Sequence, residues 1–262
     1  MGDQVNVGWN VLWSAVVVLV LITALFAVAD ARKRYDVIDV FWGLGFAVIA
    51  VLTLALAGAG PRSVLVTVLT VAWGVRLGVH IQLRNQGKGE DQRYADILKR
   101  AKGNPRLHMY RVFLIQAVIM LVVSLPVQVA AYATAPLGLV DYLGVLVWLV
   151  GFAFEAVGDW QLTRFKTDPA NRGAVLDHGL WRYTRHPNYF GDACVWWGLF
   201  LFACHDWWGP LTVVAPIGMT LLLAKGTGKP LLEKDIAGRR PGYAEYVRRT
   251  SGFFPRPPKR VA

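Results

Sequence analysis

Apolar runs of about 20 residues follow one another along this chain, and they constrain its fold more than any other feature. A helix needs a run of about that length to cross the hydrocarbon core of a bilayer. A soluble domain would not string several such runs together, and their continuous character excludes an outer-membrane barrel, whose strands alternate. The sequence therefore predicts an all-α fold, a polytopic bundle of membrane helices.

Seven apolar segments predict about seven transmembrane helices. The segments lie at about residues 9–29, 37–57, 64–83, 112–133, 139–157, 191–207 and 210–224. The first carries no charge and is expected to be a lipid-facing anchor. Pro126 is expected to kink the fourth, which helix bundles tolerate. The seventh is the shortest, and a tail rich in proline and basic residues follows it.

The distribution of charge predicts the orientation of these helices. A net charge of +11 could suggest a nucleic-acid partner, but the cations lie beside the apolar segments, as the positive-inside rule describes. With seven spans, the 28 Lys and Arg residues all fall on one side except Arg62, which lies opposite, and Arg76, which lies within the third span. The sequence thus predicts a multi-pass protein of the cytoplasmic (inner) membrane, with no nucleic-acid partner, its N-terminus outside and its C-terminus cytoplasmic.

A basic and aromatic stretch, GLWRYTRHPNYFGD at residues 179–192, interrupts the apolar pattern. Pro187 suits the first position of a helix, and the apolar residues that follow would carry that helix into the bilayer. A helix N-terminus binds anions, phosphate above all. Asn188 and Asp192 share one face of this helix, where they could bind neutral hydroxyl or amide groups. A ligand that has both phosphates and neutral polar edges is a nucleotide, so the stretch predicts a nucleotide site.

Further candidates for this site lie at the end of the fifth span and in the tail. Glu155, Asp159 and Lys166 follow one another at helical spacing along a stripe that starts inside the membrane and emerges from it. Arg164, Lys166 and Arg172 lie where phosphates could bind, although positive-inside anchoring explains these cations equally well. The predicted cofactor-binding set is Glu155, Asp159, Arg164, Lys166, Arg172, Tyr183, Arg185, His186, Asn188, Tyr189, Asp192, Glu233 and Tyr246.

Ionisable residues in the second and third spans form a second group of candidates. Asp39 lies near the cytosolic interface, and Arg76 and His80 are one turn apart on one helix face. Groups at such depth usually face the interior of a bundle or a wet cavity. Two interpretations remain open: an Asp39–Arg76 ion pair that joins two helices, and a catalytic role for Asp39 or His80. Tyr94, in the loop segment GEDQRY, is a third and more distant catalytic candidate.

Several familiar sites are missing from the sequence. It has no G-x-G-x-x-G after a predicted strand and no Walker-type loop, so neither soluble nucleotide-binding fold is expected. It has no His/Cys cluster with zinc spacing and no nucleophile in a triad-like setting, so no metal site is predicted. Cys194 and Cys204 are placed in one helix about 15 Å apart along its axis, too far to form a disulfide. A nucleotide would therefore be held between membrane helices.

The stretch at residues 179–192 resembles the C-terminal signature of the steroid 5-alpha-reductase-like membrane proteins, specifically their bacterial DUF1295 branch. That pattern runs G-L-W-R-Y-[ST]-R-H-P-N-Y-F-G-[DE], and each position is matched. The segment GEDQRY resembles another hallmark of the family. We expect one membrane-embedded domain over residues 1–262, with a substrate-side half at 1–111 and a cofactor-binding half at 112–262 that includes the cytosolic tail.

The resemblance implies NADPH-dependent reduction of an activated carbon–carbon double bond in a lipid or steroid-like substrate, with the cofactor site facing the cytoplasm. In that family, hydride passes to the β-carbon of an enone while an acid polarises the carbonyl group. We expect His80 to be the acid, with its tautomer fixed by Asp39, and Asp39 or Tyr94 to be the next candidates. The resemblance implies a Gln-Glu pair on the second span and a Tyr on the third in the eukaryotic members. Neither is plainly present in this sequence, where Asp39 and His80 occupy the comparable places.

Two other functions stay open at this point. The shorter core R-H-P-x-Y also occurs in isoprenylcysteine and phospholipid methyltransferases, so an S-adenosylmethionine-dependent methyltransferase is the main alternative. A non-catalytic membrane protein, such as a transporter subunit or a binding scaffold, is the other. The continuation Asn-Tyr-Phe-Gly-Asp at residues 188–192 favours the reductase.

Overall fold

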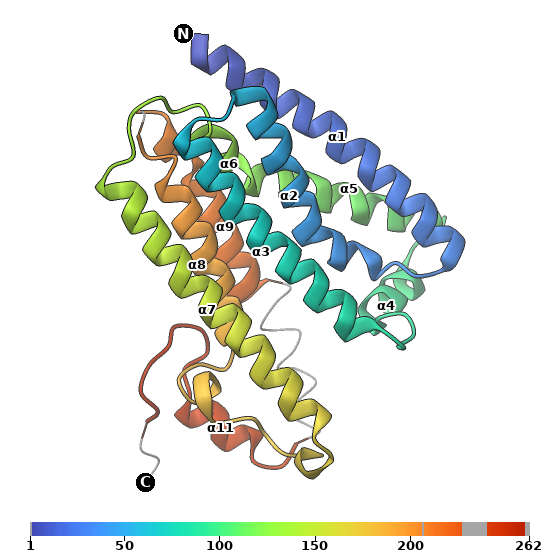
Figure 1. The fold of residues 1–262 in the computed structure, drawn as a ribbon. Helices are drawn as coiled ribbons and strands as arrows, with labels where there is room; N and C mark the ends of the chain where they lie inside the picture. Colours follow the sequence, from blue (N-terminus) through green and yellow to red (C-terminus); the bar gives the residue numbers. More distant parts are fainter. Residues whose placement is uncertain (1, 206, 227–239, 260–262) are drawn as a thin grey trace. The chain divides into compact units, whose positions relative to one another are not determined.

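The computed structural model describes residues 2–205, 207–226 and 240–259, and the regular elements of these residues are helices (Figure 1). Five of the described helices are long and apolar enough to cross a membrane. They are Asn6–Arg32, Val37–Ala57, Pro61–Asn85, Pro105–Ala130 and Leu139–Thr167. The predicted all-α fold is confirmed, and the chain is a multi-pass membrane protein.

The chain forms two compact units, which are described separately. The first comprises Met1–Gly138 and Phe202–Thr212, and the second comprises Leu139–Leu201 and Val213–Ala262. The division at residue 138 differs from the two halves expected from the sequence, which met at residue 111. The difference arises because the helix that begins at Pro105 packs against the first helix of the chain and so belongs to the first unit.

The described α-helices of the first unit are α1 (Gly2–Arg32), α2 (Val37–Ala57), α3 (Pro61–Asn85), α4 (Gln92–Arg100), α5 (Pro105–Val123) and α6 (Leu125–Ala130). Helices α2 and α3 pack side by side, with the backbones of Gly43 and Gly74 in direct contact. Small residues allow this close approach, which is how helices commonly associate in membranes. The contact fixes the start of α2 beside the end of α3.

Buried polar residues join α1 to the rest of this unit. The Asn10 amide donates hydrogen bonds to Thr53 Oγ1 at 3.0 Å and to Gln128 Oε1 at 2.9 Å. The Gln128 amide in turn donates to Ser124 Oγ at 2.7 Å, and all four side chains are buried. Such bonds are needed because a buried amide without partners is costly in an apolar environment. The expectation that the first span is a lipid-facing anchor is therefore incomplete, since one of its faces packs into the bundle.

The fourth span is interrupted close to Pro126, the residue predicted to kink it. Helix α5 ends at Val123, and α6 begins at Leu125 with Pro126 in its first turn. The Arg62 side chain, at the start of α3, is only 2% exposed. It donates hydrogen bonds of 2.8–3.0 Å to the carbonyl oxygens of Ala133, Ala135 and Pro136, which follow α6. The one cation predicted on the opposite side of the membrane is thus a buried brace.

The second unit is built on a pair of long helices. Its helical elements are α7 (Leu139–Thr167), η1 (Pro169–Asn171), η2 (Gly179–Arg182), α8 (Pro187–Leu201), α9 (Val214–Lys225) and α11 (Tyr243–Arg249). Helices α7 and α8 touch through glycines: a methyl group added at Gly151 would lie 2.6 Å from Gly191 O, and one at Gly198 would lie 2.7 Å from Trp148 N. The two backbones can lie this close only because these positions lack side chains.

The last two predicted spans are shorter than expected. Helix α8 starts at Pro187, as predicted, but ends at Leu201 after 15 residues. It is therefore about 22 Å long, less than the roughly 30 Å of a hydrocarbon core. The next apolar helical segment, Gly209–Lys225, is also shorter than a standard span. Cys204 lies in the turn after α8, so the prediction that one helix carries both cysteines is wrong.

Candidate functional site

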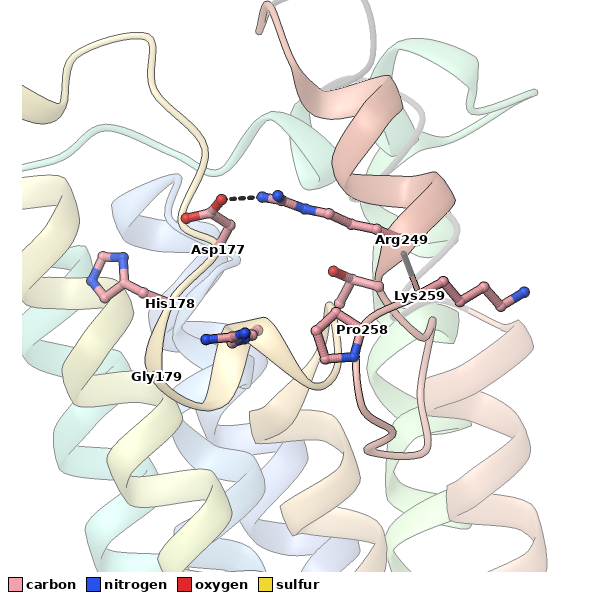
Figure 2. Close-up of a pocket in the computed structure, with 8 residues that line it drawn as sticks. Asp177, His178, Gly179, Arg249, Pro258 and Lys259 are labelled. Atoms are coloured by element: carbon pink, nitrogen blue, oxygen red, sulfur yellow. Dashed lines mark hydrogen bonds and ion pairs between the residues drawn. The ribbon is translucent and has the colours of Figure 1, made fainter. Parts of the chain in front are cut away.

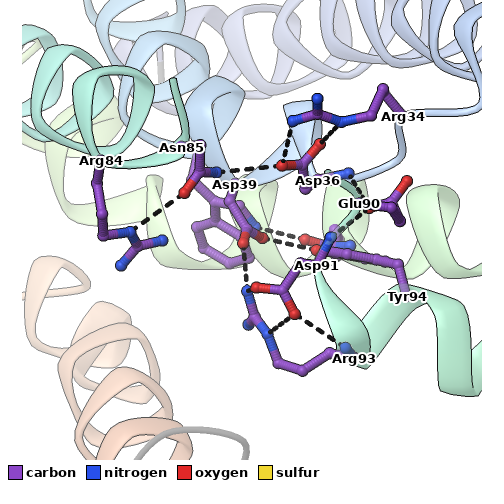
Figure 3. Close-up of polar contacts among 11 residues, drawn as sticks. Arg34, Asp36, Asp39, Arg84, Asn85, Glu90, Asp91, Arg93 and Tyr94 are labelled. Carbon is purple, nitrogen blue, oxygen red and sulfur yellow. Dashed lines mark hydrogen bonds and ion pairs between the residues drawn. The ribbon is translucent and has the colours of Figure 1, made fainter. Parts of the chain in front are cut away.

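The start of α2 carries a carboxylate that an arginine and a tyrosine of α4 hold in place (Figure 3). The Tyr94 hydroxyl donates a 2.6 Å hydrogen bond to Asp39 Oδ1, and the Arg93 guanidinium contacts Asp39 Oδ2 at 2.5 Å. Arg93 also pairs with Asp91, whose side chain caps the N-terminus of α4. Both carboxylate oxygens of Asp39 therefore have partners, and Asp39 shares the charge of Arg93 with Asp91.

The Tyr94 side chain is almost completely buried, with 5% of its surface exposed. Burial raises the pKa of Tyr94 far above its ordinary value, and the neighbouring charge of Asp39 raises it further. Both effects disfavour the phenolate. The hydroxyl group of Tyr94 therefore stays protonated at physiological pH and can act as a hydrogen-bond donor.

A second carboxylate fixes the loop that delivers α4 to this position. Glu90 accepts hydrogen bonds from the backbone N–H groups of Tyr35, Asp36 and Asp91. Arg34 adds a bidentate pair with Asp36, at 2.9 and 3.0 Å, and donates to the Lys88 carbonyl oxygen. These contacts tie the loop to the beginning of α2. The segment GEDQRY, read as a family hallmark, is therefore what places Tyr94 on Asp39.

The second unit contains a polar pair between α7 and α8. The Asn188 amide donates a hydrogen bond to Asp159 Oδ1 at 3.1 Å, and its own carbonyl oxygen accepts from Tyr189 N. Asp159 and Glu155 are buried at 6% and 3% exposure, and the backbone of Glu155 packs directly on Gly191. The Asp159 carboxylate of the predicted stripe therefore faces α8, and the Glu155 backbone lies at the same interface. Asn188 and Asp159, both predicted as cofactor-binding residues, are brought together.

The turn before α8 holds the C-terminal segment of the chain. Arg185 donates to the carbonyl oxygens of Val247 and Thr250, and its backbone N–H donates to Ser251 O. The Thr184 hydroxyl donates to Phe253 O at 2.8 Å. Arg185 is thus a buried brace within the second unit, a contribution that its charge alone did not predict.

A family model described as "Protein of unknown function (DUF1295)" matches residues 25–250 of the chain. This match covers most of the chain, including the Tyr94–Asp39 and Asn188–Asp159 pairs. The chain belongs to the DUF1295 family. The DUF1295 chain is also 23% identical over 247 residues to the uncharacterized protein C594.04c of Schizosaccharomyces pombe, an alignment that covers 82% of this chain and 67% of the yeast protein. No solved structure matches it.

The other predicted cofactor residues of this DUF1295 protein differ in accessibility. Arg164, Lys166 and Arg172 are exposed, as is the Tyr183 ring, and the Arg164 guanidinium lies 5.7 Å from the centre of the Trp160 ring. His186 and Tyr246 are buried: His186 stacks on the half-buried Tyr189, and Tyr246 donates a hydrogen bond to Trp181 O. Asp192 lies one turn after Asn188 on α8, and Glu233 lies outside the described residues.

Of the three predicted catalytic residues, the DUF1295 structure joins Asp39 and Tyr94. His80 lies on α3, partly exposed, two residues from the point where Gly78 packs against Val40 of α2. Its proposed contact with Asp39 stays a prediction, as does the alternative Asp39–Arg76 pair.

Sequence reasoning missed three members of the Asp39 cluster in this DUF1295 protein. Arg93 was quoted only as part of a motif, and Gln116 and Trp42 were not considered. Trp42 Nε1 donates to Gln116 Oε1, and the Gln116 side chain lies close enough to Tyr94 to lower the pKa of its hydroxyl group. An isolated amide such as Gln116 in an otherwise apolar span was the available signal, because polar groups in membrane helices usually serve a partner.

Proposed function

We propose that this protein reduces an activated carbon–carbon double bond in a lipid or steroid-like substrate, with NADPH as the hydride donor. The observation that carries the proposal is the Tyr94 hydroxyl, which is buried, protonated and hydrogen-bonded to Asp39. Hydride addition to an enone builds negative charge on the carbonyl oxygen, and a donor within about 3 Å stabilises that charge. The resemblance of residues 179–192 to the signature of the steroid 5-alpha-reductase-like proteins supports the same chemistry.

The contacts of Asp39 suit this role. When the Tyr94 hydroxyl turns from Asp39 to a substrate oxygen, Asp39 keeps its ion pair with Arg93. The carboxylate is therefore not left without a partner, which would cost several times more than an ordinary hydrogen bond. We propose Tyr94 as the donor, Asp39 as the group that positions it, and His80 as the next candidate.

The residues of the second unit fit a nicotinamide nucleotide. When bound, NADPH supplies the hydride. The Asn188 amide and the Asp159 carboxylate offer hydrogen-bonding groups for ribose or amide edges. Arg164, Lys166 and Arg172 are exposed at the end of α7 and in the turn that follows, where they can bind phosphates. Glu155, Tyr183, Arg185, His186, Tyr189, Asp192, Glu233 and Tyr246 complete the proposed set.

The main alternative is a lipid or isoprenylcysteine-type methyltransferase that uses S-adenosylmethionine. Transfer of a methyl group to a nucleophile needs no donor to an enolate oxygen, so the Tyr94–Asp39 pair favours reduction. The two functions predict different ligands for the purified protein. A ligand of the native state raises thermal stability, by about 2.7 kcal/mol at 100 times its dissociation constant. We expect NADPH to raise the unfolding temperature and S-adenosylmethionine to leave it unchanged; the reverse would favour the methyltransferase.

Replacing Asn188 by Ala should weaken NADPH binding by about 1–3 kcal/mol, because the substitution removes an amide and leaves the buried Asp159 carboxylate short of a partner. Titration of the protein with NADPH measures the change. Asn171→Ala is the matched control, since it removes an amide that donates to Phe165 O in the same unit. Equal NADPH affinity in Asn188→Ala and Asn171→Ala would remove Asn188 from the cofactor site.

We also propose that α8 and the Gly209–Lys225 segment cross the membrane as a sixth and a seventh span, in the cytoplasmic membrane, with the N-terminus outside and the C-terminus cytoplasmic. Short spans are accommodated by local thinning of the bilayer at modest cost. The basic residues that follow α7 and the basic tail then lie on the cytoplasmic side. The turn that contains Trp207, whose side chain is 81% exposed, would lie outside.

Labelling of Trp207→Cys tests this arrangement, in a chain whose Cys194 and Cys204 have been replaced by Ala. A membrane-impermeant maleimide added to intact cells should modify the new cysteine. Modification only after the cells are opened, or none in either state, would contradict seven crossings. Lys166→Cys in the same background is the control and should react only in opened cells.

A further inference from the structure

A pocket of about 650 Å³ lies in the second unit and is lined by residues other than the proposed cofactor set (Figure 2). It is formed by the η2 turn, the end of α11 and the chain around Pro258. Its charged lining residues are Asp177, Arg182, Arg249 and Lys259. None of the pocket residues belongs to the predicted cofactor set. The pocket therefore needs an explanation of its own.

The lining carries more positive than negative charge. Arg249 forms an ion pair with Asp177, and the side chains are 34% and 41% exposed, so solutes can reach both. Arg182 is exposed on the η2 turn. Figure 2 shows the Asp177–Arg249 pair across the pocket and the Lys259 ammonium group pointing away from it. The two guanidinium groups are therefore the cations that a ligand in this pocket would meet.

The framework around these arginines is held by buried contacts. Trp181 packs with Phe165 and Leu176, and its indole N–H donates to Gly158 O on α7. The Tyr246 hydroxyl of α11 donates to the Trp181 carbonyl oxygen at 2.6 Å. Lys259 N donates to Arg249 O at 2.9 Å, which fixes the chain on the other side of the pocket. The pocket is preformed, so a ligand would lose little of its binding energy to ordering the protein.

We infer that this pocket binds the phosphate group of a small polar molecule through Arg182 and Arg249. Guanidinium groups bind phosphate oxygens in a bidentate manner, and the pocket volume falls in the range of about 300–1,000 Å³ typical of small-molecule sites. The volume leaves room for a polar body attached to the phosphate. Asp177 competes with the phosphate for Arg249. The inference is independent of the proposed reductase activity and would stand if the protein bound no NADPH.

Two substitutions in the pocket are expected to change pyrophosphate affinity in opposite directions. In nanodiscs of phosphatidylcholine at fixed ionic strength, inorganic pyrophosphate should bind with an affinity that falls about tenfold or more in Arg182→Gln, because charge-assisted hydrogen bonds are lost. Asp177→Asn should bind pyrophosphate more tightly than the parent chain, because Arg249 is released. Arg248→Gln is the matched control: Arg248 is an exposed arginine beside Arg249 that does not line the pocket.

A second arm identifies the source of the phosphate. Nanodiscs that contain phosphatidylglycerol should raise the unfolding temperature of the parent and Arg248→Gln chains, but not of Arg182→Gln, if the ligand is a lipid headgroup. A response to pyrophosphate alone identifies a soluble phosphate compound. The inference is overturned if Arg182→Gln matches Arg248→Gln in both arms. It is also overturned if Asp177→Asn lowers stability without raising affinity, because the ion pair then serves only the fold.

Discussion

Replacing Tyr94 by Phe is expected to lower the turnover of the proposed reduction about 100-fold or more, the usual contribution of a general acid. The substitution removes the hydroxyl that is bound to Asp39 and leaves the buried ring in place. NADPH affinity should be nearly unchanged, because Tyr94 belongs to the first unit and the proposed nucleotide residues to the second. Turnover and NADPH affinity, measured separately for the parent chain and for Tyr94→Phe, test these two expectations.

Tyr110→Phe is the matched control for this effect. It removes a hydroxyl that is hydrogen-bonded to Thr23 in the same unit, and it should leave turnover unchanged. The pH profile gives a further check. The raised pKa of Tyr94 keeps the donor protonated, so turnover should not decline through loss of this proton near pH 10, the ordinary value for a tyrosine. Turnover at the parental rate in Tyr94→Phe would contradict the assignment and make His80→Ala the next variant to measure.

Adding a single methyl group at Gly191 is expected to destabilise the second unit by about 3 kcal/mol or more, at the upper end of the effects of overpacking. The new carbon would lie 2.5 Å from the carbonyl oxygen of Gly151 and 2.9 Å from Glu155 Cα. Both are backbone atoms of α7 and cannot rotate away. Helices α7 and α8 would have to separate, and the Asn188–Asp159 hydrogen bond between them would be lost.

Unfolding of Gly191→Ala in nanodiscs or mild detergent measures this effect. Gly218→Ala is the control, because Gly218 lies in helix α9 of the same unit and an added methyl group there meets no atom within 4 Å. That control should be neutral or stabilising by up to about 1 kcal/mol, the difference in helix propensity between Gly and Ala. Similar stability of the two variants would mean that α7 and α8 do not pack as closely as described.

The helices of the first unit could be predicted from sequence because their signal is local. The run at residues 37–57 forms α2 with the same limits, because the length of an apolar run sets the length of a membrane helix. The fourth span is interrupted close to Pro126, because proline has no N–H to donate to the preceding turn. The Asn10 amide was overlooked within a run that otherwise lacks polar groups except Ser14 and Thr23. Its partners, Thr53 and Gln128, are far away in sequence, and periodicity does not reveal them.

The candidate site was predictable in its residue types but only in part in its pairings. Asn188 and Asp159 were both selected, and they meet because the glycines of α7 and α8 allow close contact. Contacts of Asp39 were expected on α3, at His80 or Arg76, and these stay predictions. The partners that the structure describes, Tyr94 and Arg93, lie on α4. Glu90 binds three backbone N–H groups before α4 and so positions Tyr94, a contact that needs the folded loop. Arg185 was included in the cofactor-binding set, and its charge says nothing of the carbonyl groups it binds.

Isotope transfer tests whether the protein passes hydride from NADPH to a lipid. The purified protein in nanodiscs would be incubated with a lipid extract of its source cells and NADPH deuterated at both hydride positions of its dihydronicotinamide, and in parallel with methyl-deuterated S-adenosylmethionine. Mass spectrometry of the lipids then follows the label. We expect deuterium in a lipid that has gained two hydrogens, from NADPH only, with far less in Tyr94→Phe. Transfer of a labelled methyl group, or no transfer from NADPH by the parent chain, would contradict it.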